Sequence, residues 1–125
     1  MAYESRFDKA ERMIYLHFWD NLSADEFHAS LAGEREFFDG MTGPIGLLVN
    51  TTGLRSIPPA IITHARNTYF ARHKNTIIAM VGASTFVNAL AQMFSKLTGI
   101  TVSNFSEMAE AEAFLKEQIA SRSHR

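Results

Sequence analysis

Small polar and basic side chains cluster behind the apolar segment 45–49, in a loop and in the first turns of a helix that begins after Pro58-Pro59. Sites in α/β proteins tend to lie at the carboxyl ends of strands, and this segment reads as strand, loop and helix. Hydroxyl and guanidinium groups there suit hydrogen bonding to an anion or to a protein partner. The candidate binding residues are Thr51, Thr52, Arg55, Ser56, Thr63 and Arg66.

Residues with the spacing of a catalytic or metal site are missing from the sequence. The five histidines are scattered, no pair has the i,i+4 spacing of a helical metal site, and there is no cysteine. Carboxylates such as Asp20, Asp25 and Asp39 are available, but their spacing pairs none of them for acid–base work. The sequence therefore predicts no enzyme, no metal site and no cofactor.

Two further groups of residues have a functional and a purely structural interpretation. The helix segment 64–74 is locally basic, which fits either docking of an acidic partner or an ordinary solvated face. Hydroxyl and amide side chains at the expected strand ends would form an anion-binding crevice or would only cap helices, and capping is the favoured interpretation. These side chains are Thr51, Thr52, Ser56, Ser84, Thr85, Asn88 and Asn104.

Hydropathy patterning predicts the elements that must position these residues. Residues 3–8 alternate as an edge strand, and segments 13–19, 45–49, 76–81 and 100–105 read as further strands. Helices are expected over 23–38, 60–74, 85–97 and 107–119, with Ser23 and Glu26 as a capping box and Gly99 as a C-terminal glycine. The order is β-β-α-β-α-β-α-β-α. We expect one α/β domain over 1–125, a mainly parallel sheet of about five strands with an N-terminal antiparallel hairpin and four helices.

The third predicted helix carries more apolar residues than one buried face requires. We expect Phe86, Leu90, Met93, Phe94 and Leu97 to face inward. The excess width, together with six methionines, indicates a homo-oligomer surface or an apolar pocket, and a homodimer is expected.

Composition excludes several classes of protein. Apolar residues make up 46% of the 125 residues, so a packed core is expected. The formal net charge of -1 argues against a general nucleic-acid binder. No apolar run reaches the roughly 20 residues of a membrane span, and the first residues lack a signal core, so a cytoplasmic location is expected.

The element order resembles the STAS-like domains, and most nearly the uncharacterised bacterial SpoIIAA-like proteins. The resemblance rests on the hairpin, the strand ends 47–50 and 78–82, and the closing pattern of 102–105 followed by 111–115. The resemblance implies a non-enzymatic regulatory module similar to anti-sigma-factor antagonists, which bind a partner kinase and are phosphorylated on a serine.

The phosphoacceptor pattern departs from that family. With Asn50 at the strand end, the acceptor position falls near Pro58-Pro59-Ala60, and proline has no hydroxyl. Ser56 and Thr63 are the nearest alternatives, although neither fits the motif. Two functions follow as hypotheses: an interaction module using the loop after Asn50, or a small-ligand carrier or sensor. The carrier would use the polar crevice for an anion, or an apolar cavity beneath the third and fourth helices.

Overall fold

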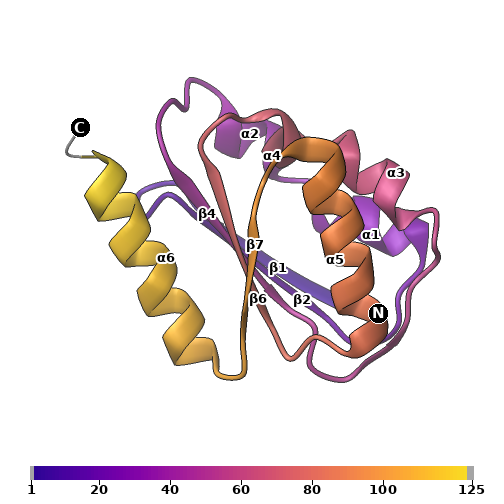
Figure 1. The fold of residues 1–125 in the computed structure, drawn as a ribbon. Helices are drawn as coiled ribbons and strands as arrows, with labels where there is room; N and C mark the ends of the chain where they lie inside the picture. The colour runs from indigo at the N-terminus through magenta and orange to yellow at the C-terminus, as the bar shows by residue number, and fades with distance from the viewer. Residues whose placement is uncertain (1, 124–125) are drawn as a thin grey trace.

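The computed structural model describes residues 2–123, which form one main sheet flanked by helices (Figure 1). The sheet has five strands in the order β1-β2-β4-β6-β7. Its strands are β1 (Tyr3–Asp8), β2 (Met13–Phe18), β4 (Ile45–Asn50), β6 (Thr76–Val81) and β7 (Val102–Phe105). The helices are α1 (Ala24–Ser30), α2 (Glu34–Phe38), α3 (Ile61–Arg66), α4 (Tyr69–Arg72), α5 (Thr85–Thr98) and α6 (Met108–Ser123).

The strand pairing confirms the predicted α/β architecture. β1 and β2 form an antiparallel hairpin in which Tyr3 faces Phe18 and Asp8 faces Met13. The pairs β2–β4, β4–β6 and β6–β7 are all parallel. Parallel neighbours need crossover connections, and helices supply them here.

A second, two-stranded sheet was not expected. β3 (Asp20–Asn21) pairs in parallel with β5 (Leu54–Ser56), segments that the sequence assigned to a strand break and a loop. The backbone N–H of Leu22 also donates to the carbonyl of Ser56 at 3.0 Å. This pairing fixes the loop after β4 against the end of β2.

Two of the four predicted helices are divided. The segment 23–38 breaks between α1 and α2, where Gly33 lies against Phe7 so closely that a Cβ would approach the ring to 3.0 Å. The segment 60–74 breaks at Thr68, whose backbone is extended. The Thr68 hydroxyl donates to the carbonyl of Ala65 at 2.7 Å and accepts the N–H of Ala71 at 3.2 Å. One side chain thus ends α3 and begins α4.

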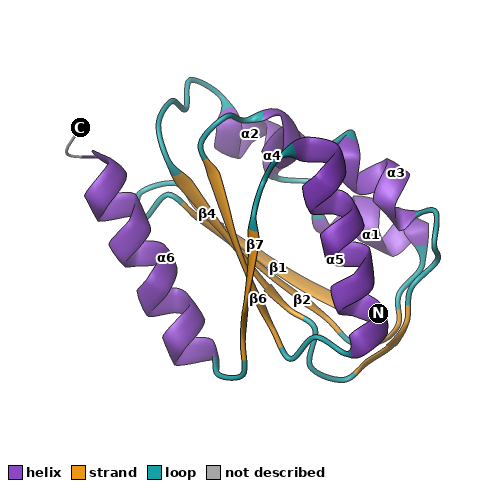
Figure 2. Cartoon of the chain, in the orientation of Figure 1, coloured by secondary structure: helices purple, strands orange, loops and turns teal. Residues whose placement is uncertain are grey.

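The two faces of the sheet are covered unequally (Figure 2). α6 alone covers one face, and its Ala111 and Leu115 pack with Met13, Leu48 and other fully buried residues. α1 to α5 cover the other face and enclose the larger core. Side chains alternate along each strand, so one strand supplies both cores.

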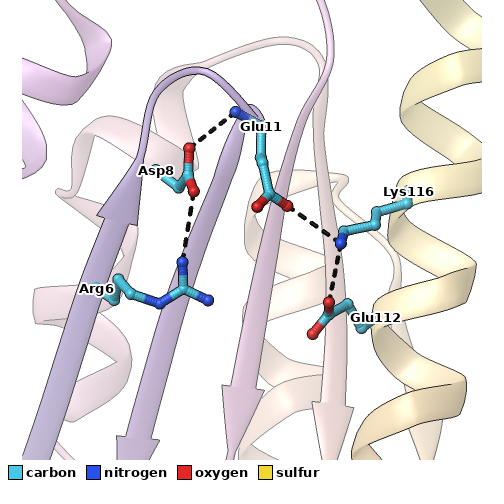
Figure 3. Close-up of polar contacts among 5 residues, drawn as sticks. All are labelled: Arg6, Asp8, Glu11, Glu112 and Lys116. Carbon is cyan, nitrogen blue, oxygen red and sulfur yellow. Dashed lines mark hydrogen bonds and ion pairs between the residues drawn. The ribbon is translucent and has the colours of Figure 1, made fainter.

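α6 is also attached through its charged surface (Figure 3). The Lys116 ammonium lies 3.1 Å from Glu11, in the β1–β2 turn, and 2.9 Å from Glu112 on the same helix. The hydrogen bonds that the Lys116 ammonium donates to these two carboxylates, the one to Glu112 first, raise the pKa of Lys116. Met108, at the first position of α6, is 39% exposed.

Within residues 2–123, no helix combines the length and the apolarity that crossing a bilayer requires.

Candidate functional site

The loop that follows β4 is held in place by its own threonine and asparagine side chains. Asn50 accepts the N–H of Thr52 at 3.0 Å. Thr51 is only 4% exposed, and both its N–H and its hydroxyl donate to the carbonyl of Val81, at 2.8 and 3.0 Å. Thr51 therefore ties the ends of β4 and β6 together. Because its hydroxyl is buried and bonded, Thr51 is not available to a partner, contrary to its selection as a binding residue.

The candidates Arg55 and Ser56 lie on β5 and differ in whether their side chains have hydrogen-bond partners. The Ser56 hydroxyl donates to the amide oxygen of Asn21 at 2.7 Å, which joins the loop to β3. Arg55 is exposed, and among residues 2–123 its side chain forms neither a hydrogen bond nor an ion pair. Arg55 thus presents a free cation from a fixed backbone.

The beginning of α3 carries no side-chain cap. Ala60 occupies the N-cap position after Pro58-Pro59, so the position at which the sequence resemblance would place a phosphoacceptor holds no hydroxyl. Ile61 and Ile62 point into the core, whereas Thr63 and Arg66 are exposed. Only Thr63 places a hydroxyl in the first turn of this helix.

Several of the side chains considered for a polar crevice form local hydrogen bonds instead. Ser84 caps α5 by accepting the N–H of Val87 at 3.2 Å. Asn104 donates to the side chain of Asn88 at 3.0 Å. The Ser84 cap matches the favoured capping interpretation, whereas the pair of asparagines was not predicted. Both contacts leave an anion fewer free donors there.

α5 has two apolar faces, and the prediction that all five large side chains point inward is wrong for three of them. Leu90 and Phe94 are buried, as expected. Phe86, Met93 and Leu97 are exposed by 49%, 52% and 52%. The reason is angular: Phe86, Met93 and Leu97 lie along the edge of the buried face, roughly 90° around the helix from its centre, where the core no longer covers them.

The buried face of α5 borders an apolar cavity of about 110 Å³. The cavity lies between the sheet and the helices α3 and α5, with Phe27 of α1 and Phe70 of α4 at its sides. Every lining residue is apolar. One alternative of the carrier hypothesis places an apolar cavity beneath the third and fourth predicted helices, α5 and α6. That location is wrong, because those two helices cover opposite faces of the sheet.

Two histidines that are far apart in sequence meet on the outer side of α1 and α3. Nε2 of His28 lies 3.0 Å from Nδ1 of His64, and the rings are nearly perpendicular with centroids 4.6 Å apart. Sequence reasoning considered only helical spacing within one segment and therefore missed this pair. Within the described residues 2–123, no group of three or more histidine, aspartate or glutamate side chains could hold a metal ion.

One carboxylate is buried among the helices. Glu34 is 5% exposed and accepts the backbone N–H of Phe70, at the beginning of α4, at 3.0 Å. Burial raises the pKa of Glu34, and the N–H groups of Phe70 and Tyr69 and the nearby Arg72 oppose that rise. The contact fixes α4 against α2.

The distribution of acidic residues along the chain is uneven. No aspartate or glutamate occurs between Asp39 and Glu107, a stretch that contains α3, α4 and α5. Exposed cations remain there, including Arg55, Arg66 and Lys96, and within residues 2–123 none of these three forms an ion pair. The net charge of the whole chain is near zero and does not reveal this local excess of cations. The excess can nevertheless be read from the positions of the charged residues in the sequence.

Comparisons with known proteins inform the fold. No protein-family model matches the chain, and no curated protein matches its sequence. The chain is similar in structure to an uncharacterised protein of the DUF3478 family with a SpoIIAA-like fold from Shewanella loihica, with a TM-score of 0.66 and 11% sequence identity. The match covers 91% of this chain and 93% of that one. The strand order, the hairpin and this structural match together show that the chain has a SpoIIAA-like fold.

Proposed function

We propose that the protein is a non-enzymatic interaction module that binds an acidic protein partner through the outer side of α3 and α5. One observation carries the proposal: α5 exposes a row of large apolar side chains on a part of the chain that has cations and no carboxylates. We call Phe86, Met93, Leu97, Arg66 and Lys96 the α3–α5 surface.

The apolar residues of this surface have the arrangement of a docking stripe. Phe86, Met93 and Leu97 are spaced seven and four residues apart, which places them along one side of a helix. Contiguous exposed apolar residues commonly mark interaction sites. Aromatic, methionine and arginine side chains are enriched at such sites, and all three types occur here.

The charges of the surface favour an acidic partner. Arg66 on α3 and Lys96 on α5 are exposed without a counter-ion among residues 2–123, and α3 packs beside α5. Complementary charge steers association and suppresses wrong partners. A second copy that docked by the same face would bring these cations together. The expected homodimer would therefore use another face, and sedimentation velocity over a range of concentrations tests for it.

Side-chain geometry supports a role without catalysis. Apart from ion pairs, the side chain–side chain hydrogen bonds within residues 2–123 join Ser56 to Asn21, His28 to His64 and Asn104 to Asn88. None of these pairs sets a nucleophile against a base in the way that acyl or phosphoryl transfer requires.

The test is affinity capture from the native host with matched variants. Met93→Ser combined with Arg66→Glu alters the α3–α5 surface. Met108→Ser combined with Arg122→Glu makes the same changes on α6, where Met108 is 39% exposed. We expect the first variant to lose a partner that the wild type and the α6 variant both retain. A partner lost only by the α6 variant would refute the proposed surface.

A second measurement tests the chemistry of the partner. Binding of the purified partner should weaken as salt rises from about 0.05 to 0.5 M, because exposed charge pairs are screened. Triple alanine substitution of Arg55, Ser56 and Thr63 shows whether the loop after β4 belongs to the same surface. A salt-independent affinity would contradict an acidic partner.

A further inference from the structure

We infer that the cavity between the sheet and helices α3 and α5 is a binding site for a small, uncharged apolar ligand, about the size of one six-membered ring. This inference is independent of the proposed interaction surface, because it concerns the buried face of α5. The ligand class follows from the volume of the cavity, from its lining, and from the contacts that hold its roof, the helices α3 and α5, away from the sheet.

The volume selects small ligands. The cavity measures about 110 Å³. An engineered apolar cavity of roughly 150 Å³ stays dry and binds benzene. The cavity in this protein is somewhat smaller, so it limits a ligand to a single ring or a short branched alkyl group. A long acyl chain would not fit without displacing the core.

The lining selects uncharged and apolar ligands. Leu16, Val49 and Met80 contribute from the sheet, and Ala65, Leu90 and Ala91 contribute from the roof. None of the lining side chains carries a hydrogen-bonding group. A water molecule needs two to four polar partners, so water gains little here, and a ligand hydroxyl would be buried without a partner.

The roof is held at a distance by contacts outside the cavity. α3 is fixed to α1 by the His28–His64 hydrogen bond of 3.0 Å, and its end is fixed by the Thr68 hydroxyl at 2.7 Å from the carbonyl of Ala65. At the cavity the two helices present the small side chains Ala65 and Ala91. These contacts oppose collapse of α3 onto the sheet, and the alanines leave room for a ligand.

The experiment compares toluene with phenol, which have nearly the same shape. Thermal unfolding and methyl NMR are followed while each compound is titrated into the full chain. We expect toluene to raise the melting temperature with concentration, as any ligand of the native state must, and to shift the methyl signals of Val87, Leu90 and Ala91. Phenol should produce a clearly smaller effect, because its hydroxyl has no partner in the cavity.

A matched pair of alanine variants locates the site. Ala91→Leu fills the cavity, whereas Ala89→Leu adds the same atoms to the exposed side of α5. We expect Ala91→Leu to raise the melting temperature of the free protein by a few degrees and to abolish the toluene effect. Ala89→Leu should preserve the toluene effect. Ala65→Leu provides the same test from α3 if Ala91→Leu does not fold.

Three outcomes would overturn the inference. The first is that toluene changes neither the melting temperature nor the methyl signals. The second is that phenol acts as strongly as toluene, which indicates binding outside the apolar cavity. The third is that toluene binds the Ala91→Leu and Ala65→Leu variants as tightly as the wild type.

Discussion

The two faces of the sheet differ in how completely they are packed. On one face, the single helix α6 lies close to the strands, and its buried residues Ala111 and Leu115 are fully inaccessible. On the other face, the helices α1 to α5 border a partly open cavity of about 110 Å³ and enclose a buried carboxylate, Glu34. The same strands serve both faces, because alternate residues point to opposite sides.

This difference in packing between the two faces suggests different roles: the α6 face mainly stabilises the fold, and the α1–α5 face provides the binding surfaces. The α6 face has its charges outside, where Lys116 joins Glu11 and Glu112, and its interior is closely packed around Gly46 (Figure 3). Among residues 2–123, the α1–α5 face has exposed cations that form no ion pair, exposed apolar residues on α5 and a cavity. We expect substitutions on the first face to change folding and substitutions on the second to change interactions.

The largest effect is expected from Leu115→Ala on α6. Removing this fully buried side chain leaves a cavity that the close packing cannot fill, so the free energy of unfolding should fall by about 2–5 kcal/mol. Urea denaturation measures the change. Leu97→Ala, at a residue that is 52% exposed on α5, is the control and should change stability by no more than about 0.5 kcal/mol. Equal losses in the two variants would remove the contrast between the faces.

The next largest effect is that two substitutions by larger residues should change the free energy of unfolding in opposite directions. A Cβ at position 46 would lie 2.6 Å from the sulfur of Met13 and 3.3 Å from the Cβ of Leu115. Gly46→Ala should therefore destabilise the protein by about 1–3 kcal/mol through overpacking. Ala91→Leu, which adds more atoms beside the cavity, should stabilise it by about 0.5–2 kcal/mol. Calorimetry of the two variants decides whether free space occurs on only one face.

The buried carboxylate predicts a pH-dependent difference. The pKa of Glu34 is raised in the folded protein, so its protonation favours the folded state at low pH and this stabilisation is lost as pH rises through the folded pKa. Glu34→Gln keeps an acceptor for the Phe70 N–H without a charge. Relative to wild type, this variant should be more stable at pH 7 than at pH 4 in urea denaturation.

Glu36→Gln is the control for this pH effect, since Glu36 is exposed on the same helix. It should follow the wild type across the same pH range. Glu34→Ala should lower stability by about 1–3 kcal/mol at neutral pH, because the buried N–H of Phe70 would lose its acceptor. A pH profile of Glu34→Gln parallel to that of wild type would contradict the assigned role of the carboxylate.

The smallest effect is expected at the surface ion pairs of α6. Lys116→Gln should change the melting temperature only slightly, because exposed ion pairs are screened and hold flexible side chains. The residual difference from wild type should disappear in about 1 M salt. A difference that persists at high salt would show that Lys116 stabilises the α6 face by packing of its methylene groups and not by charge.

Local sequence signals predicted the five strands of the main sheet and several helix ends correctly. The alternation over 3–8 gave the edge strand β1, and the Ser23–Glu26 capping box begins α1 with both of its hydrogen bonds present. Gly99 ends α5 with a φ of 78°, as a C-terminal glycine should. These features depend on residues a few positions apart, so the sequence contains the whole interaction.

Features that join distant segments could not be predicted in this way. The break at Thr68 depends on a hydroxyl that bonds the backbone on both sides, and the β3–β5 pair joins residues more than 30 positions apart. Thr51 looked available in the sequence, yet Val81 accepts its hydroxyl across two strands. The outward position of Met93 depends on where the sheet ends beneath α5, which helical periodicity alone does not specify.

The sequence by itself determined the order of strands and helices, the apolar faces that form the two cores, and the stretch without carboxylates that makes one region cationic. Only the tertiary structure decided which apolar residues of α5 are buried, that His28 meets His64, and that a cavity lies between the sheet and the helices α3 and α5. The physical reason is that hydropathy and capping act over one or two turns of chain. A cavity and an exposed face depend on how separate elements fit together.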